Sequence, residues 1–499
     1  MSRKMSKLDV TKKHYSKLKA MSKITKIPSE IRSFFSEKRR SSTMDAFTKL
    51  VENINLDSRS LGGIKRENCQ LTNLQVFQIL LLLPFFAVKG FSHYGSSVLH
   101  SMFGGKKDVF YSFMSQDSIN WRKLIYRINN WLITKVVVRN DHKKSHLPTV
   151  LIADDTDLPK TGLHMEAIGK IFSHVHQRCI LGYKALMLCW SDGRTQFMLD
   201  FSLHGEKGKI EGKEQGLTSD QRQKRYTRER DKETAMAKRK GEYFKSKGEK
   251  LVEMVKEAIS NKVPFEYLLV DSWFTCTELV DFVCRRHKKF HLLGMAKMGN
   301  TKYRTARWND LSAKAIIAKL KAAKKIKYSR RYRCHYAEIK VSLGKHPVKL
   351  FFCKRGNKEG WKVLLTTDLS IEFLRAYEIY AMRWAIEVFF SDGKRILGLA
   401  DCSARDFSAQ ISHVSLVLIR YNLLASMKRT LDYETIGGLF GDIYMGVHEL
   451  TVVEKIWEIV VEVVAVVAEL IEADSDELTR QIIENDKRLA ALRAYAKTA

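Results

Sequence analysis

Four side chains of types that can bind phosphate or metal ions recur at helical spacing in the segment YAMRWAIEVFFSDGK. They are Tyr380, Arg383, Glu387 and Lys394, separated by three, four and seven residues. On a helix of about 3.6 residues per turn, these offsets predict that all four face one way. One interpretation is an Arg383–Glu387 ion pair on a solvated face. The other is a metal-binding glutamate beside three side chains that grip phosphate.

Carboxylates also follow two apolar runs further upstream. HLPTVLIADDT and PFEYLLVDSWF predict buried strands that end near Asp154, Asp155 and Asp271. Any one of these acids is more often a helix cap or a turn residue. Together with Glu387 they suit Mg²⁺, because two-metal phosphoryl transfer needs carboxylates that converge from separate elements. Neighbours on a strand point to opposite faces, so Asp154 is favoured, with Thr156 on its side, and Asp155 stays the alternative.

The composition favours a polyanionic partner. The 499 residues carry a formal net charge of +32, and the longest apolar run, LLLLPFFAV, is too short to span a membrane. Double-stranded DNA is therefore the expected partner rather than a membrane. Eight cysteines without a CxxC pair argue against a zinc site and for a reducing compartment. With no apolar signal core at the N-terminus, the expected location is cytoplasmic and nucleoid-associated.

Strands that alternate with helices predict an α/β core with helical flanks. The hairpin YKALMLCW–SDGR–TQFMLDFSLH belongs to this core. The charged segment from about 205 to 250 is predicted to be a mobile loop or a solvated helix. The expected divisions are a basic, helical DNA-binding region at 1–145, the first part of the catalytic core at 146–298, a β-rich insertion with its own small sheet at 299–366, the final helical part of the core at 367–430, and a helical C-terminal region for dimerisation at 431–499.

The apolar side chains between the four signature positions are expected to pack on the other faces of their helix. They are Trp384, Ile386, Val388, Phe389 and Phe390.

The pattern Y-(2)-R-(3)-E-(6)-K resembles the signature of bacterial DDE-type insertion-sequence transposases of the IS-four-like group. Every gap matches, and the two upstream acids come in the expected order. The resemblance covers roughly residues 148–397. It implies a ribonuclease-H-like fold in which Asp154, Asp271 and Glu387 are the catalytic acids and hold Mg²⁺, with Mn²⁺ as a substitute.

The same resemblance implies cut-and-paste transposition through a hairpin at the transposon end. In such relatives a tryptophan of the insertion holds a flipped base, and the signature Tyr, Arg and Lys bind nearby phosphates. Trp361 is the matching candidate here and Trp308 the second, although a packed strand residue is an equally good interpretation of Trp361. A homodimer on the DNA is the expected assembly.

Two alternatives stay open at this point. One is a nuclease of similar fold that cuts DNA without strand transfer, and the other is an inactive relative that only binds DNA. Intact acids argue against the second. The signature and the insertion argue against the first, because simple cleavage needs neither.

Overall fold

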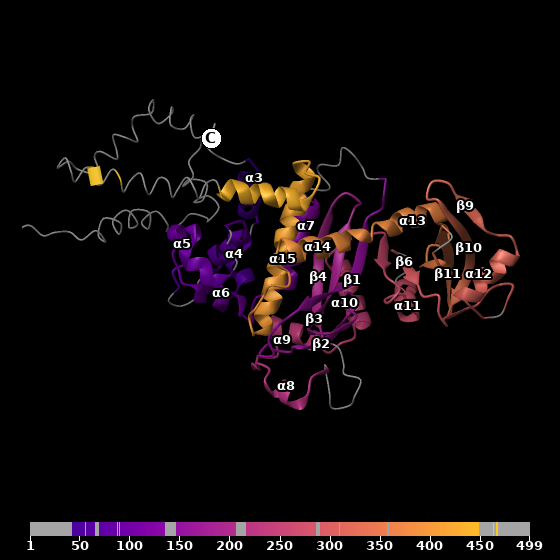
Figure 1. Ribbon diagram of the computed structural model, residues 1–499, viewed down its shortest axis with the longest axis horizontal. Coiled ribbons are helices and arrows are strands. Elements are labelled where there is room, and N and C mark those ends of the chain that lie inside the picture. The colour runs from indigo at the N-terminus through magenta and orange to yellow at the C-terminus, as the bar shows by residue number, and fades with distance from the viewer. Residues whose placement is uncertain are drawn as a thin grey trace, which may run out of the picture.

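The computed structural model of this chain describes residues 42–448 except 55, 65–68, 87, 89, 135–145, 206–215, 286–289, 309 and 357–358, together with 463, 466 and 467. The predicted basic arm at the N-terminus and most of the predicted acidic tail, from residue 449 on, lie outside the described residues except 463, 466 and 467. Figure 1 shows the rest as helices of the N-terminal part on one side, a central sheet, and a second lobe rich in strands on the other side.

The central part of the sheet has the order β4-β3-β1-β5-β6. Its strands are β1 (Val150–Pro159), β3 (Arg178–Ser191), β4 (Gln196–His204), β5 (Tyr267–Val270) and β6 (His291–Ala296). The β1–β3 and β3–β4 pairs are antiparallel, whereas β5 and β6 continue parallel to β1. This is the ribonuclease-H-like arrangement, so the predicted fold class is confirmed. The short strand β2 (Gly169–Ser173) pairs with β3 as well.

The apolar runs form these strands because helices cover the sheet. The first four residues of β1 are fully buried, as expected for a strand with both faces covered. Contacts come from α14 (Trp384–Arg395) onto β1, from α10 (Lys247–Ser260) onto β3 and β4, and from α7 (Trp121–Leu132) and α15 (Phe407–Thr430) onto β4. The predicted hairpin is present as β3 and β4, with Gly193 at positive φ in its turn.

The strands predicted as a separate sheet instead extend the central one. Strand β12 (Lys362–Thr366) pairs with β6, followed by β11 (His346–Arg355), β10 (Cys334–Leu343) and β9 (Lys327–Ser329). The result is one sheet of ten strands, so the expectation of a separate small sheet is wrong. An open edge at β6 has unpaired backbone groups, and β12 satisfies them.

The same segment holds one helix and a minor sheet that the alternating pattern did not predict. Helix α12 (Ala313–Ala322) is N-capped by Ser312, and its apolar residues recur at helical spacing. Strands β7 (Lys302–Tyr303) and β8 (Leu311–Ser312) pair as a two-stranded sheet. Helix α11 (Thr277–Arg285) connects β5 to β6 as predicted.

The N-terminal helices share a core with the end of the chain. They are α3 (Ser42–Glu52), α4 (Asn73–Leu82), α5 (Val98–Phe103), α6 (Lys107–Met114) and α7, with the 3-10 helices η1 (Ser58–Leu61), η2 (Leu83–Phe86) and η3 (Phe91–Ser96). Helix α15 is buried on all sides for most of its length and packs against α3, α4, α6, α7 and β4. In Figure 1 it stands between the N-terminal helices and the sheet. The helical character predicted for this region is therefore present, although the helices do not form a body of their own.

In its described residues 216–250, the segment predicted to be a loop or a solvated helix is partly both: residues 224–234 have no helix or strand, and its first helix has no buried residue, but its second helix carries buried charges. It forms α8 (Ser219–Gln223) and α9 (Ala235–Glu242), and then leads into α10. Glu242 is buried and accepts charge-assisted bonds from Arg122 at 2.6 Å and Lys250 at 2.8 Å. Buried charges persist only when they are paired. The partner Arg122 lies far away in the sequence, on α7, so the charge run alone did not reveal the burial.

None of the helices described here is long and apolar enough to cross a membrane.

Candidate active site

Asp154 and Asp271 lie at neighbouring positions of two parallel strands. Ala153 of β1 is in register with Val270 of β5, and each acid is the next residue of its chain. The Asp271 carboxylate accepts the backbone N–H of Trp273 at 2.9 Å and of Phe274 at 3.2 Å. These bonds close a turn directly after β5 and fix the direction of the carboxylate. The structure therefore brings the two upstream acids together at one edge of the sheet.

Close packing behind this turn depends on a glycine. The Thr275 hydroxyl donates to the backbone oxygen of Asp271 at 2.9 Å. A Cβ at Gly294 of β6 would lie 2.3 Å from that hydroxyl oxygen and 2.8 Å from a methyl group of Val270. Gly294 thus lets β6 approach the turn that holds Asp271.

The signature residues span two helices rather than one. Helix α13 (Phe373–Ala381) ends before Met382, and α14 begins at Trp384. At the junction each backbone N–H donates to the carbonyl oxygen three residues earlier, Met382 to Ile379 at 3.1 Å and Arg383 to Tyr380 at 3.0 Å. The junction keeps right-handed helical dihedral angles, so the axis continues and the spacing argument still holds.

All four signature side chains face the place where β5 ends beside β1. Tyr380 donates to the backbone oxygen of Val270 at 3.3 Å, and Lys394 donates to the Thr156 hydroxyl at 2.7 Å. Arg383 donates through Nη1 to Asp154 Oδ2 at 2.6 Å and through Nη2 to Glu387. The prediction of a shared face is confirmed, and the Arg383–Glu387 pair points into the site rather than into solvent.

Asp154 and Asp155 have different partners because β1 continues through both of them. Asp154 contacts Arg383 beside α14, on the same side as Thr156. Asp155 is instead ion-paired with Lys247, which lies in the first turn of α10. The geometry favours Asp154 as the residue that faces Asp271 and Glu387.

Electrostatics at the site are dominated by burial and by crowding of the carboxylates. Burial, with Asp271 and Asp155 close by, raises the pKa of Asp154 to about 6, although Arg383 opposes the shift. Burial raises the pKa of Tyr380 to about 12, with Asp271 and Asp154 contributing. Burial also lowers the pKa of Lys394. A carboxylate held near neutrality in a cluster of acids is typical of a functional site.

The donor set suits a hard divalent ion, but an arginine stands among the acids. Asp154, Asp271 and Glu387 offer carboxylate oxygens, which Mg²⁺ prefers. In the part of the chain that the structure describes, no three His, Cys, Asp or Glu side chains are placed to hold a metal ion as they stand. The guanidinium of Arg383 bridges Asp154 and Glu387 and offsets part of their negative charge. That the three acids share an ion therefore stays a prediction.

The two tryptophans predicted to hold a flipped base are both half-buried. The centroid of the Trp361 ring lies 5.3 Å from the Lys321 ammonium. The centroid of the Trp308 ring lies 5.4 Å from the Lys319 ammonium. Both pack against the hydrophobic core. The indole N–H of Trp361 is buried with no hydrogen-bond partner. The role of these rings in DNA binding stays a prediction.

Two other tryptophans beside the acids are exposed. Trp384 is 64% exposed and Val388 is exposed as well, so the expectation that they pack on other faces of the helix is wrong, whereas Ile386 and Phe389 are buried. Trp273, two residues after Asp271, is 48% exposed. Sequence reasoning missed Trp273, although its place in LLVDSWF, next to a predicted ligand, was a usable signal.

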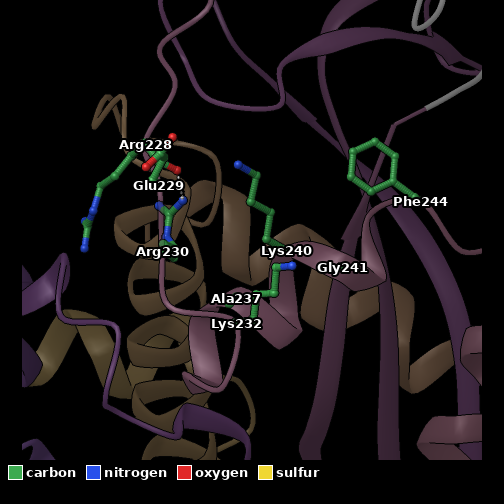
Figure 2. Close-up of a pocket in the computed structure, with 8 residues that line it drawn as sticks. All are labelled: Arg228, Glu229, Arg230, Lys232, Ala237, Lys240, Gly241 and Phe244. Atoms are coloured by element: carbon green, nitrogen blue, oxygen red, sulfur yellow. Dashed lines mark hydrogen bonds between the residues drawn. The ribbon is translucent and has the colours of Figure 1, made fainter.

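Basic side chains also gather around a pocket lined in part by Arg228, Arg230, Lys232 and Lys240 (Figure 2). Most of this charge is already compensated. Arg230 makes a bidentate pair with Glu166 at 2.6 and 2.7 Å, and Lys240 reaches the same carboxylate at 2.6 Å. Arg228 is paired with acids of other segments. The pocket is therefore an ion network that stabilises the fold rather than a free phosphate site.

Comparison with known families agrees with this geometry. Residues 97–289 match the DDE superfamily endonuclease family, and residues 245–423 match the transposase DDE domain family. Asp154 and Asp271 lie in the first match, and Asp271 and Glu387 lie in the second. Both matched families are of the DDE type, and together the two matches support a DDE transposase. No protein of curated function matches this transposase.

Among solved structures, the transposase is similar to the piggyBac transposase synaptic complex with hairpin DNA. The TM-score is 0.42 at 13% sequence identity, and the match covers 85% of this chain and 80% of that chain.

Proposed function

We propose that this DNA transposase is a member of the YREK-signature, IS-four-like group and moves DNA by cut-and-paste through a hairpin at the transposon end. One observation carries the proposal. Side chains at all the signature positions converge from α13 and α14 on the edge where Asp154 and Asp271 lie side by side. Four residue types at fixed gaps thereby serve one site.

Asp154, Asp271 and Glu387 are the proposed ligands of Mg²⁺, with Mn²⁺ as a substitute. When bound there, a divalent ion would lower the pKa of an attacking water or 3′-hydroxyl and stabilise the leaving oxygen. The three acids would hold the ion where β5 ends beside the middle of β1, and the turn after Asp271 fixes one carboxylate. Asp155 would remain paired with Lys247 and take no part as a ligand.

Arg383 has two alternative partners in this proposal. Without an ion, its guanidinium compensates Asp154 and Glu387. With the acids occupied, the same planar group would be free to bind a DNA phosphate through two N–H donors. Tyr380 and Lys394 flank it and would contact neighbouring phosphates. Each of the three residues would thus position the strand relative to the acids.

Cleavage of a supercoiled plasmid that carries the transposon ends tests the mechanism. In Mg²⁺ we expect nicked, hairpin and inserted products from the wild type. Asp271→Asn should lower all of them by at least about 100-fold, the range for loss of a group that stabilises transition-state charge. Asp310→Asn is the matched control, because Asp310 is an exposed acid paired only loosely with Arg304 at 3.7 Å.

The products also separate this proposal from its two alternatives. Nicked or linear DNA without hairpin or insertion would indicate a nuclease. Binding without any cleavage would indicate an inactive relative. Equal cleavage by the wild type and Asp271→Asn would remove the acids from the mechanism altogether.

The proposed partners are the transposon ends and the target DNA, held by a homodimer in the nucleoid. A chain of net charge +32 releases many counterions on binding, so affinity should fall steeply with salt. Because the helices before residue 135 share a core with α15, removing residues 1–145 would disrupt the fold. A sharper test removes 1–41 alone, which should weaken binding and reduce the salt slope. Light scattering on paired ends reports the dimer, and a monomeric complex would contradict it.

A further inference from the structure

The exposed indole of Trp273 lies directly after a candidate metal ligand, and the proposed function leaves it without a role. Trp273 follows Asp271 by two residues, and its backbone N–H bonds the Asp271 carboxylate. Large aromatic side chains contribute most when buried, so 48% exposure next to a reactive centre favours a contact made only with a ligand. Nearly all of the other tryptophans in the described part of the chain are buried or half-buried, Trp384 being the exception.

The ring is held in place by the elements that carry the acids. The Lys247 ammonium lies 4.1 Å from the centroid of the Trp273 ring, within the range of a cation–π contact. The same lysine is ion-paired with Asp155, the neighbour of Asp154 in β1. Phe274 packs edge-on against the indole with the centroids 4.7 Å apart. An aromatic ring fixed from several directions loses little freedom when a ligand binds to it.

We propose that Trp273 is a nucleotide-stacking residue, which holds an unpaired base of the DNA strand whose phosphate lies at the acids. Lys247 is a positioning residue for the ring. The inference rests on the proposed function, because only a strand seated at Asp154 and Asp271 brings a base within reach of this indole. An indole face accepts any base, so the contact selects for unpaired bases and not for sequence.

The location of Trp273 distinguishes it from Trp361 and Trp308. Those two rings lie on the insertion and pack against the hydrophobic core. Trp273 instead stands on the turn that orients a candidate ligand. A base stacked there would be fixed relative to the reacting phosphate by one short segment of chain.

Fluorescence anisotropy with three labelled duplexes of equal length tests the proposal in the full chain, with Ca²⁺ in place of Mg²⁺ so that the acids are occupied. One duplex is fully paired, the second has a central three-base bubble, and the third has the same bubble with abasic sites. The wild type should bind the bubble about tenfold to hundredfold more tightly than the paired duplex, as expected for stacking of one base. The abasic bubble should lose this preference.

Variants assign the preference to a residue. Trp273→Ala should bind all three duplexes with the affinity of the wild type for paired DNA, whereas Trp273→Phe should keep most of the preference. Lys247→Met keeps the aliphatic stem but removes the charge over the ring, so it should lower the preference only in part. Trp361→Ala tests the competing candidate. Tyr328→Ala, which removes an exposed ring on β9, is the matched control and should behave as the wild type. Melting temperatures check that each variant folds. If Trp273→Ala does not fold, Trp273→Leu takes its place and is compared with Trp273→Phe.

Loss of the preference in Trp361→Ala with retention in Trp273→Ala would overturn the proposal, as would a wild type that does not distinguish the bubble from paired DNA. Neither result would change the outcome of the plasmid assay with Asp271→Asn, so the proposed catalytic function would still stand. Undiminished cleavage by Asp271→Asn, in contrast, would refute the proposed function whatever Trp273 binds.

Discussion

If Asp154 holds a metal ion as proposed, protons must compete with that ion for its carboxylate. Burial and the neighbouring acids hold the pKa of this side chain at about 6, above its ordinary 3.8. The ion needs the deprotonated form, so we expect Mn²⁺ affinity to be constant above about pH 7 and to fall about tenfold per pH unit below about pH 6. Isothermal titration between about pH 5 and pH 8 measures it. Asp154→Asn should bind weakly at every pH, and a wild-type affinity that is constant down to about pH 5 would contradict the assignment.

Arg383 should compete with the metal ion while supporting the reaction. Its guanidinium bonds Asp154 at 2.6 Å and also contacts Glu387, and these acids together with Tyr380 outweigh burial and raise the pKa of Arg383. Arg383→Ala frees both carboxylates, so Mn²⁺ should bind more tightly than in the wild type.

Cleavage by Arg383→Ala should nevertheless fall by about 100-fold, because a bidentate phosphate contact is lost. Arg383→Lys keeps the charge but not the planar fork, and should recover only part of the rate. Weaker metal binding by Arg383→Ala would show that the guanidinium supports the ligands instead of competing for them.

Among the elements, the junction of β5 with β6 controls where Asp271 points. Gly294→Ala would place a Cβ 2.3 Å from the Thr275 hydroxyl oxygen and 2.8 Å from Val270. We expect a loss of about 1–3 kcal/mol in the free energy of unfolding, as for other overpacked positions. We also expect the cleavage rate of the folded variant to fall, by more than the loss of folded protein explains, because the turn that orients Asp271 is displaced.

Urea unfolding and the plasmid assay together test this expectation. The double variant Gly294→Ala/Thr275→Ala removes the closest clash and should regain part of the stability. If Gly294→Ala alone leaves both stability and cleavage at wild-type levels, the backbone tolerates the methyl group and Gly294 has no role in positioning.

Across the whole molecule, buried ion pairs tie the N-terminal helices to the catalytic core. Arg122 of α7 bonds Asp200 of β4 at 2.8 Å and Glu242 of α9 at 2.6 Å. Arg122→Leu leaves two buried acids short of a partner, so we expect it to cost about 3–5 kcal/mol. Arg127→Leu on the same helix is the control, since Arg127 and its partner Asp57 are both exposed and such pairs contribute at most about 1 kcal/mol.

The shift of the urea midpoint compares the two variants under identical conditions. Similar small shifts for both would mean that the N-terminal helices are held mainly by their apolar contacts with α15. A large shift for Arg122→Leu alone would establish that the buried ion pairs stabilise the contact between the N-terminal helices and the catalytic core.

The sequence by itself determined the parts of the site that depend on local spacing. The periodicity of a helix places Tyr380, Arg383, Glu387 and Lys394 on one face, and this holds even across the junction between α13 and α14. Apolar runs that end in acids marked the strands beside Asp271, because a strand buried on both faces leaves a clear local pattern. The alternation of strands with helices indicated the α/β core, whereas its ribonuclease-H-like arrangement was implied by the family resemblance.

Only the tertiary structure decided which side chains meet. Asp154 and Asp155 are adjacent residues of the same type. Their roles differ because Arg383 is ion-paired with Asp154 and Lys247 with Asp155. The extension of the sheet by β12 and the burial of Glu242 likewise depend on partners far away in the chain. Long-range pairing has no local periodicity, since its free energy comes from neighbours that the fold itself supplies.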